Sequence, residues 1–174
     1  MESNLLTECH IDTLMAKVIL FPKKDYNHQK GCNNVLKRMR EMFSNRTALC
    51  IIDDDKKKTT KDFLNFVHYK THNSLTIYKH KSEPHYVITI GKAAENFILH
   101  CAEQCKILLE DYDLPTDLIE LKKITKHTKS LEDTESKFKK LFLDIKQNEN
   151  SDFCKLAQWI EMFKENPYNL DVKL

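Results

Sequence analysis

The chain has 174 residues, with 28 Lys and Arg against 26 Asp and Glu, and therefore a formal net charge of +2. That length suffices for a domain with its own hydrophobic core. So small a net charge neither demands nor excludes a polyanionic partner, so evidence for one must come from local charged patches. Only two glycines and four prolines are present, too few for a sandwich or barrel rich in turns. No apolar run approaches the roughly 18 residues of a transmembrane helix and no export signal is evident. We therefore expect a cytoplasmic protein that does not enter a membrane.

The first third of the chain predicts strands alternating with helices. Residues 4–8 (NLLTE) predict a strand, and apolar residues at helical spacing from Ile11 onward predict a helix after a two-residue turn. The segment 33–43 (NNVLKRMREMF) has the pattern of an amphipathic helix, with Asn33 as its cap. Residues 48–52 (ALCII) are continuously apolar. This is typical of a strand that helices cover on both faces, as in a parallel sheet.

The middle of the chain predicts a short helix, two paired strands and a long helix. Residues 59–69 (TTKDFLNFVHY) have a short apolar face behind two threonines that could cap a helix. Residues 75–80 and 85–90 read as strands joined by the turn KSEP. The apolar spacing in 91–112 predicts a strong helix.

Three further helical segments follow Pro115, and the last of them begins at a capping Ser151 or Asp152. The whole order predicts an α/β fold with a mostly parallel sheet flanked by helices over residues 1–112. Residues 113–174 are expected to form a helical extension packed on that core. The three segments are 118–123, 136–147 and 151–163.

Four carboxylates follow the two predicted parallel strands. Glu8 ends the first strand and Asp12 lies one helical turn further on, while Asp53 and Asp55 end the buried strand on the same side. Open α/β sheets bind ligands at these strand ends. Their mutual repulsion is relieved either by raised pKa values or by bound cations, and all-oxygen ligands select hard ions such as Mg²⁺ or Mn²⁺. The alternative is that DDDKKK, at residues 53–58, is a solvated loop whose charges cancel locally.

Two of these acidic segments resemble the Toprim domain, the metal-binding fold of topoisomerases, bacterial primases and the OLD family of nucleases. That family places a Glu after its first strand, usually as E-G-x-x-D, and a D-x-D after a later apolar strand. The sequence ECHID matches the first pattern at Glu8 and Asp12, and IIDDDK matches the second at Asp53 and Asp55. Cys9 stands where the family has Gly, the residue that best tolerates positive φ.

A third segment, KAAENFIL at residues 92–99, is similar to the one that follows the D-x-D in OLD-like Toprim nucleases, where its Glu adds a metal ligand. The resemblance covers about residues 4–110. It implies a Toprim-like fold, Mg²⁺ or Mn²⁺ as cofactor, and hydrolysis of DNA or RNA with Glu8, Asp53 and Asp55 as catalytic residues. The implied metal ligands are Glu8, Asp12, Asp53, Asp55 and Glu95.

A nuclease also needs positive charge beside the scissile phosphate. We expect Lys56, directly after the D-x-D, to supply it as a catalytic residue. Lys30, in a polar loop with His28, could also meet a phosphate. Three lysines of the last-but-one helical segment could return to the cleft, although the alternative for each is an exposed, solubilising side chain. These three are Lys137, Lys139 and Lys140.

Two functions from different classes remain open. The first is a metal-dependent nuclease; stand-alone Toprim chains resemble effectors of bacterial anti-phage systems, held by a partner ATPase of the ABC or AAA type. Such an ATPase would be a separate protein, because this sequence has no Walker loop. The second is a non-catalytic interaction protein with a residual acidic pocket. It would dock a partner through the apolar stripe of its tail, at Phe138, Leu141, Phe142, Ile145, Trp159 and Phe163.

Overall fold

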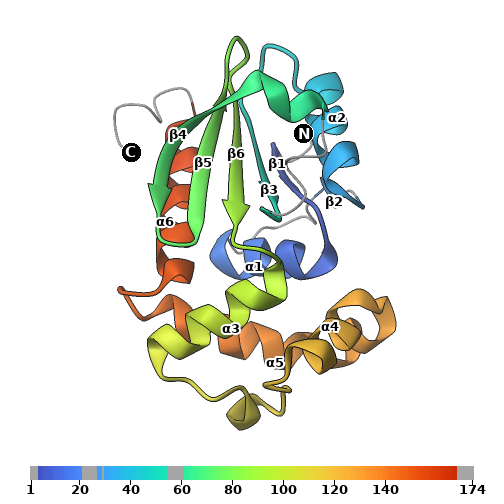
Figure 1. The fold of residues 1–174 in the computed structure, drawn as a ribbon, viewed down its shortest axis with the longest axis vertical. Coiled ribbons are helices and arrows are strands. Elements are labelled where there is room, and N and C mark those ends of the chain that lie inside the picture. Colours follow the sequence, from blue (N-terminus) through green and yellow to red (C-terminus); the bar gives the residue numbers. More distant parts are fainter. Residues whose placement is uncertain (1–3, 21–26, 29, 55–60, 168–174) are drawn as a thin grey trace.

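The computed structural model describes residues 4–20, 27–28, 30–54 and 61–167. Within them the chain forms an α/β fold, in which a mixed sheet of strand order β2-β1-β3-β6-β5-β4 is flanked by helices (Figure 1). The strands are β1 (Leu5–Thr7), β2 (Asn27–His28), β3 (Ala48–Ile52), β4 (Phe66–His72), β5 (Leu75–His80) and β6 (His85–Ile90). The helices are α1 (His10–Leu20), α2 (Cys32–Met42), α3 (Ala94–Cys105), α4 (Leu118–Lys126), α5 (Thr128–Lys146) and α6 (Asp152–Glu165), with short 3-10 helices η2 (Lys61–Asn65) and η3 (Leu109–Tyr112).

The sheet is parallel on one side and antiparallel on the other. Strands β2, β1, β3 and β6 run parallel, whereas β5 and β4 are antiparallel to their neighbours. The predicted pairing of 75–80 with 85–90 is confirmed, with Leu75 opposite Ile90. The predicted helix over 59–69 is wrong from Phe66 onward: η2 is a short 3-10 helix, and the chain then continues as strand β4. The tight turn between β4 and β5 brings the two strands into register, so backbone pairing overrides the local apolar pattern.

Successive residues of the central strands enter two different cores. Leu49 and Ile51 of β3 pack into the larger core with α1, α3, α5 and α6, while Cys50 and Ile52 pack against α2 on the other face. All five β3 residues are buried. The period of two therefore places β3 between two helical layers, as its continuous apolar run predicts.

Two helix ends differ from the sequence expectation. Helix α2 begins at Cys32 with Gly31 as its N-cap, not with Asn33. Gly31 has φ 91°, a left-handed value that glycine adopts without the steric cost of a side chain. The long helix expected over 91–112 is confirmed from Ala94 but ends at Cys105, where Lys106 turns to φ 56° and closes the last carbonyls.

The C-terminal helices share their core with the α/β segment. The tail's apolar stripe, which includes Phe138, Phe142 and Phe163, is buried and lies in the same cluster as residues of β3 and α1. That stripe is therefore interior and not a docking surface, because its side chains already contact the sheet-covering helices. Ser151 caps α6 as expected, its Oγ accepting the Cys154 N–H at 3.0 Å. None of the described helices is long and apolar enough to cross a bilayer.

A buried carboxylate ties α6 to the rest of the fold. Asp152 has no exposed surface and accepts hydrogen bonds from Asn73 Nδ2 (2.9 Å), from the backbone N–H and hydroxyl of Ser74, and from Gln104 Nε2 (3.2 Å). Its own N–H donates to Gln104 Oε1 at 2.8 Å. Burial raises the pKa of Asp152, but these hydrogen bonds outweigh it, and the pKa lies below its ordinary value of 3.8. One carboxylate thus joins the β4–β5 turn, α3 and α6.

Replacing this carboxylate is expected to destabilise the fold. In Asp152→Asn the amide NH₂ group faces hydrogen-bond donors and cannot accept from them as the carboxylate oxygen did. The free energy of unfolding should therefore fall by about 3 kcal/mol. Because the folded pKa lies below 3.8, the wild-type advantage should be present above about pH 4 and disappear as the pH falls through the folded pKa. Urea denaturation at intervals of about one pH unit between pH 3 and 7 measures both the loss of stability and its pH dependence.

Asp133→Asn provides the matched control, because Asp133 is exposed on α5. It should unfold like the wild type. Equal stability of Asp152→Asn and Asp133→Asn at neutral pH would contradict the structural role of Asp152.

Candidate active site

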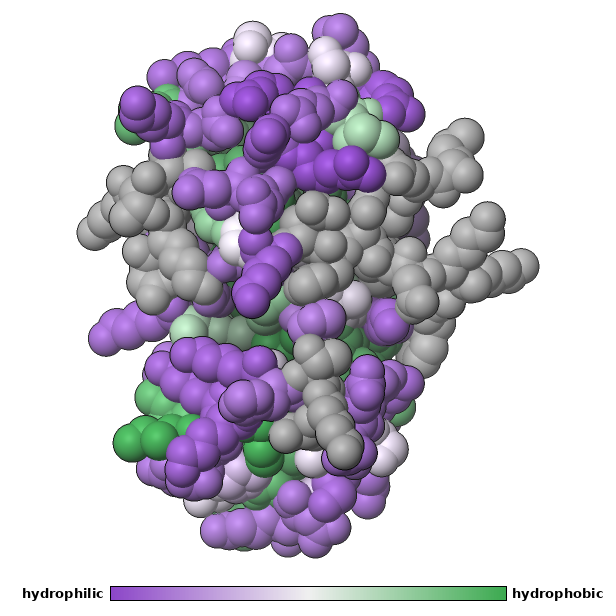
Figure 2. Space-filling view, turned by 90° about the vertical axis from the view of Figure 1, so that its right-hand side faces the viewer, coloured by the Kyte–Doolittle hydropathy of each residue, from purple (hydrophilic) through white to green (hydrophobic). Residues whose placement is uncertain are grey.

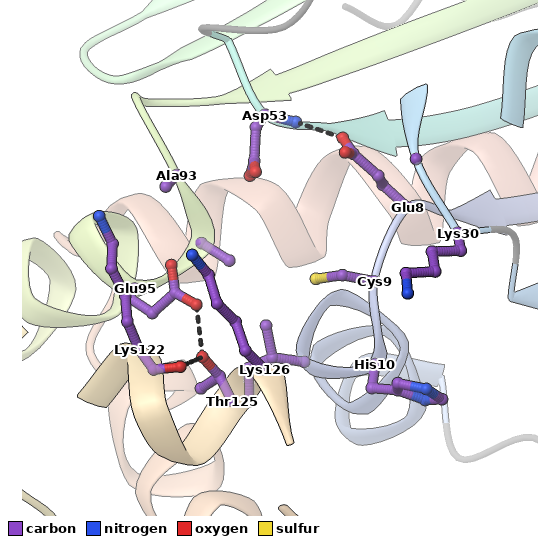
Figure 3. Close-up of a pocket in the computed structure, with 13 residues that line it drawn as sticks. Glu8, Cys9, His10, Lys30, Asp53, Ala93, Glu95, Lys122, Thr125 and Lys126 are labelled. Carbon is purple, nitrogen blue, oxygen red and sulfur yellow. Dashed lines mark hydrogen bonds between the residues drawn. The ribbon is translucent and has the colours of Figure 1, made fainter. Parts of the chain in front are cut away.

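Two of the predicted acidic residues meet at the carboxyl ends of neighbouring parallel strands. Strands β1 and β3 pair in register, with Thr7 opposite Ile51. Glu8 and Asp53 follow these strands directly, and the Asp53 backbone N–H donates to Glu8 Oε2 at 3.2 Å (Figure 3). Both side chains are buried. The structure therefore brings Glu8 and Asp53 together at the carboxyl ends of the parallel strands, as their positions directly after the two strands predict.

Asp12 lies behind these two residues, in the first turn of α1. It has no exposed surface, and its Oδ2 accepts the Cys9 N–H at 3.1 Å. Its Oδ1 is buried and accepts no hydrogen bond from the described part of the chain. A buried carboxylate oxygen without a hydrogen-bond donor is rare in folded proteins unless an ion or a water molecule binds it. This oxygen is the feature of the site that fits a cation most directly.

The turn from β1 into α1 is made without glycine. Cys9 is not among the non-glycine residues with positive φ in the described ranges, so its backbone needs no left-handed conformation. The turn is held by Thr13, whose N–H and hydroxyl both donate to Cys9 O, at 3.0 and 2.9 Å. The Thr7 and Thr13 hydroxyls are also hydrogen-bonded, at 2.6 Å. Cys in place of the family's Gly therefore leaves this turn unstrained.

Burial and mutual repulsion shift the ionisation of the acidic group. Burial raises the pKa of Asp12 well above its ordinary value, and the negative charges of Asp53 and Glu8 raise it further. Burial also raises the pKa of the Cys9 thiol, with the Asp12 carboxylate as the next cause. Cys9, whose sulfur points into the pocket (Figure 3), is accordingly a neutral thiol and not a thiolate nucleophile.

Glu95 lies across the pocket, in the first turn of α3. It is 7% exposed, and the hydroxyl of Thr125 from α4 donates to its Oε1 (Figure 3). Thr125 is buried as well and also contacts Lys122 O at 3.4 Å. The side chain that the resemblance implies as a ligand is thus held by a residue of the C-terminal extension.

Glu8, Asp53 and Glu95 line a pocket of about 630 Å³ that lies between the carboxyl ends of the parallel strands, α1, α3 and α4. Figure 2 faces the side of the molecule that carries α2 and α4, where hydrophilic side chains predominate in the upper part and hydrophobic atoms show at mid-height and within the lower part. The pocket contains acidic, basic and small side chains together. Its lining is Glu8, Cys9, His10, Ile11, Lys30, Gly31, Asp53, Ala93, Ala94, Glu95, Lys122, Thr125 and Lys126.

The lysines that line the pocket are not the tail-helix lysines that the sequence suggested. The lysines expected to return from the tail helix lie elsewhere, because Lys137 pairs with Asp113, Lys139 pairs with Glu135 and Lys140 lies over the Tyr112 ring. The pocket instead receives Lys30, Lys122 and Lys126. Of these, only Lys30 was a candidate from sequence. The sequence shows that Lys122 and Lys126 are four residues apart, but it does not show which way that face of the helix points.

The remaining predicted residues complete the comparison. Asp55 and Lys56 lie outside the described residues. As the side chains lie, no three Asp, Glu, His or Cys residues in the described ranges are grouped closely enough to hold a metal ion. Glu8, Asp12 and Asp53 offer oxygen ligands from one side, whereas Glu95 is turned toward Thr125. The donor set suits a hard divalent ion in its chemistry, and enclosing one requires side chains to turn from these positions.

Removing the charge of Asp12 is expected to stabilise the protein without metal. Because its folded pKa is raised, ionisation of Asp12 costs stability as the pH rises from 3.8 toward the folded pKa. Asp12→Asn keeps an oxygen for the Cys9 N–H and should raise the free energy of unfolding at pH 7 by about 1–2 kcal/mol. Urea denaturation in EDTA should show a smaller gain near pH 4 than at pH 7. A loss of stability at pH 7 would contradict this account.

The hydrogen bond between Thr125 and Glu95 can be tested by an isosteric pair. Thr125→Val keeps the shape but removes the donor to a buried carboxylate, which should cost about 2 kcal/mol. Thr125→Ser keeps the donor and loses one methyl group, which should cost less than about 1 kcal/mol. Urea denaturation compares the two variants directly, and equal stability of both would show that the hydroxyl contributes nothing.

The comparisons with known proteins identify no relative. No family model, no curated protein and no solved structure matches this chain. The resemblance to the Toprim domain thus depends on the short segments at residues 8–12, 51–56 and 92–99. Any assignment of function therefore depends on the residues of this site and their geometry.

Proposed function

We propose that this chain is a Toprim-type nuclease that hydrolyses phosphodiester bonds of DNA or RNA with Mg²⁺ or Mn²⁺. One observation carries the proposal: Glu8, Asp12 and Asp53 converge at the carboxyl ends of adjoining parallel strands, opposite Glu95. Burial raises the pKa of Asp12 well above its ordinary value, and the charges of Asp53 and Glu8 raise it further, a perturbation that clusters at functional sites.

The chemistry of the donors favours a divalent ion. Glu8, Asp12 and Asp53 would hold it, with Asp55 and Glu95 as the further ligands that the resemblance implies. When bound, such an ion polarises phosphoryl oxygens and makes water a better nucleophile near neutral pH. The protein would supply the oxygen ligands and a partly dry pocket. Lys56, the catalytic lysine proposed from sequence, follows the D-x-D directly.

The resemblance also suggests a biological context, which we include in the proposal. Stand-alone Toprim chains resemble cytoplasmic effectors of bacterial anti-phage defence, controlled by a partner ATPase of the ABC or AAA type. This chain has no Walker loop of its own. A partner would therefore have to supply any ATP hydrolysis.

A non-catalytic interaction protein is the second candidate. Two observations favour it: no three described side chains are grouped to hold a metal ion, and Glu95 is engaged by Thr125. In that case the pocket would be a remnant of a metal site. The tail's apolar stripe cannot serve as its docking surface, because those side chains are buried in the core.

Removal of one central carboxylate should abolish both metal binding and cleavage. Asp53→Asn keeps the shape of the side chain but removes a charged oxygen ligand, so cleavage should fall at least about a hundredfold. Calorimetric titration with Mn²⁺ measures binding. Incubation with plasmid, single-stranded DNA and transfer RNA, with Mn²⁺ or with EDTA, measures cleavage.

Asp54→Asn is the matched control, since Asp54 is the next residue and does not line the pocket. It should bind Mn²⁺ and cleave like the wild type. Absence of Mn²⁺ binding in the wild-type protein would overturn the metal site. Binding without cleavage, even with a partner ATPase added, would favour the second candidate.

A further inference from the structure

We propose that helix α4 supplies the phosphate-binding side chains of this site, with Lys122 and Lys126 binding the backbone phosphates of a nucleic acid. The inference rests on the proposed nuclease function and deepens it, because it names the part of the substrate that the C-terminal extension holds. It also makes the extension a wall of the active site.

The two lysines share one face of α4, and that face borders the pocket. They are four residues apart, one helical turn, so their side chains lie one above the other. Leu121 and Thr125, their neighbours in sequence, are buried against the rest of the protein. Figure 3 shows the ammonium groups of Lys122 and Lys126 extending from α4 toward the side of the pocket where Glu95 lies.

Helix α4 is capped at its N-terminal end and joined to α3 near its C-terminal end. Asp117 caps the helix by accepting the N–H groups of Ile119 and Glu120, at 2.9 and 3.0 Å. Near the other end, the Thr125 hydroxyl donates to Glu95 of α3. Leu121, between them, has no exposed surface. The two lysines are therefore presented to the pocket by an anchored helix and not by a loop.

Neither lysine is neutralised by an acidic partner in the described ranges. Lys123, the residue between them, contrasts with this: it lies on the outer face and pairs with Glu120 at 2.6 Å. Lys122 is half-buried and Lys126 exposed, and both share the pocket with Glu8, Asp53 and Glu95 without a direct ion pair to any of them. Two like charges one turn apart repel each other. An anion between them relieves that repulsion.

The arrangement matches the needs of a phosphodiester. Its charged oxygens need cations, and a wall of carboxylates alone would repel them. The acidic wall suits divalent ions, whereas ammonium groups on the opposite wall suit phosphate oxygens as point charges. Contacts of this kind position a nucleic acid without reading its sequence. The shared chemistry is that of DNA and RNA alike, so the experiment must separate the two.

Binding without metal isolates this contribution from catalysis. In EDTA, fluorescence anisotropy measures the affinity of labelled single-stranded DNA, duplex DNA and single-stranded RNA of the same sequence over a range of salt concentrations. The double variant Lys122→Gln, Lys126→Gln should bind its preferred nucleic acid at least about tenfold more weakly than the wild type. Its plot of log affinity against log salt should be less steep by about 1.5, because two phosphate contacts are lost.

Lys123→Gln is the matched control, because it removes one lysine of the same helix that faces away from the pocket. It should leave affinity and salt dependence unchanged, and thermal melting should show all variants folded. Equal binding by the double variant and by Lys123→Gln would overturn the inference, as would absence of binding to every probe by the wild type.

Failure of the nuclease proposal would look different. Suppose that the wild type cleaves nothing with Mn²⁺, and that only the double variant binds nucleic acid more weakly than the wild type. The phosphate-binding role then stands and the catalytic one falls. If the wild type cleaves and the double variant binds and cleaves equally well, the nuclease proposal stands and the role of α4 falls. The probe that binds most tightly identifies DNA or RNA as the source of the phosphates.

Discussion

The repulsion among buried carboxylates at the ends of β1 and β3 is the constraint on which the site depends. Asp12 has no exposed surface and faces the charges of Asp53 and Glu8, so its ionised form is costly. A protein selected for stability alone would place apolar or paired groups there. Sites of function commonly carry such a cost, which the rest of the fold must offset. Here the surrounding strands and helices supply two apolar cores that meet at the sheet.

The C-terminal helices contribute more than a cover for the core. Their aromatic side chains fill the larger core, and Asp152 connects α6 to α3 and to the β4–β5 turn. Helix α4 then reaches the pocket, where Thr125 holds Glu95. Stability and the proposed chemistry are thereby coupled. Any movement of α4 relative to α3 changes both the direction of the Glu95 carboxylate and the cations that face it.

Much of the fold followed from local patterns. The continuous apolar run of β3, the hairpin of β5 and β6 and the C-terminal helices were predictable, because periodicity and capping residues report on local structure. The strand β4 was not, since η2 and β4 share one stretch with an apolar spacing that also suits a helix. Its identity comes from pairing with β5, a partner that only the chain reversal at residues 73–74 provides.

The sequence by itself determined which acidic residues follow which strands, whereas the pairing of β1 with β3 in the folded sheet brings Glu8 and Asp53 together, because parallel neighbours place their carboxyl ends side by side. Only the tertiary structure decided what faces them. Lys122 and Lys126 enter the pocket, and Lys137 and its neighbours do not, because the packing of α4 and α5 sets the direction of each helix face. Spacing along a helix tells which side chains lie together, but the direction of that face is a property of long-range packing.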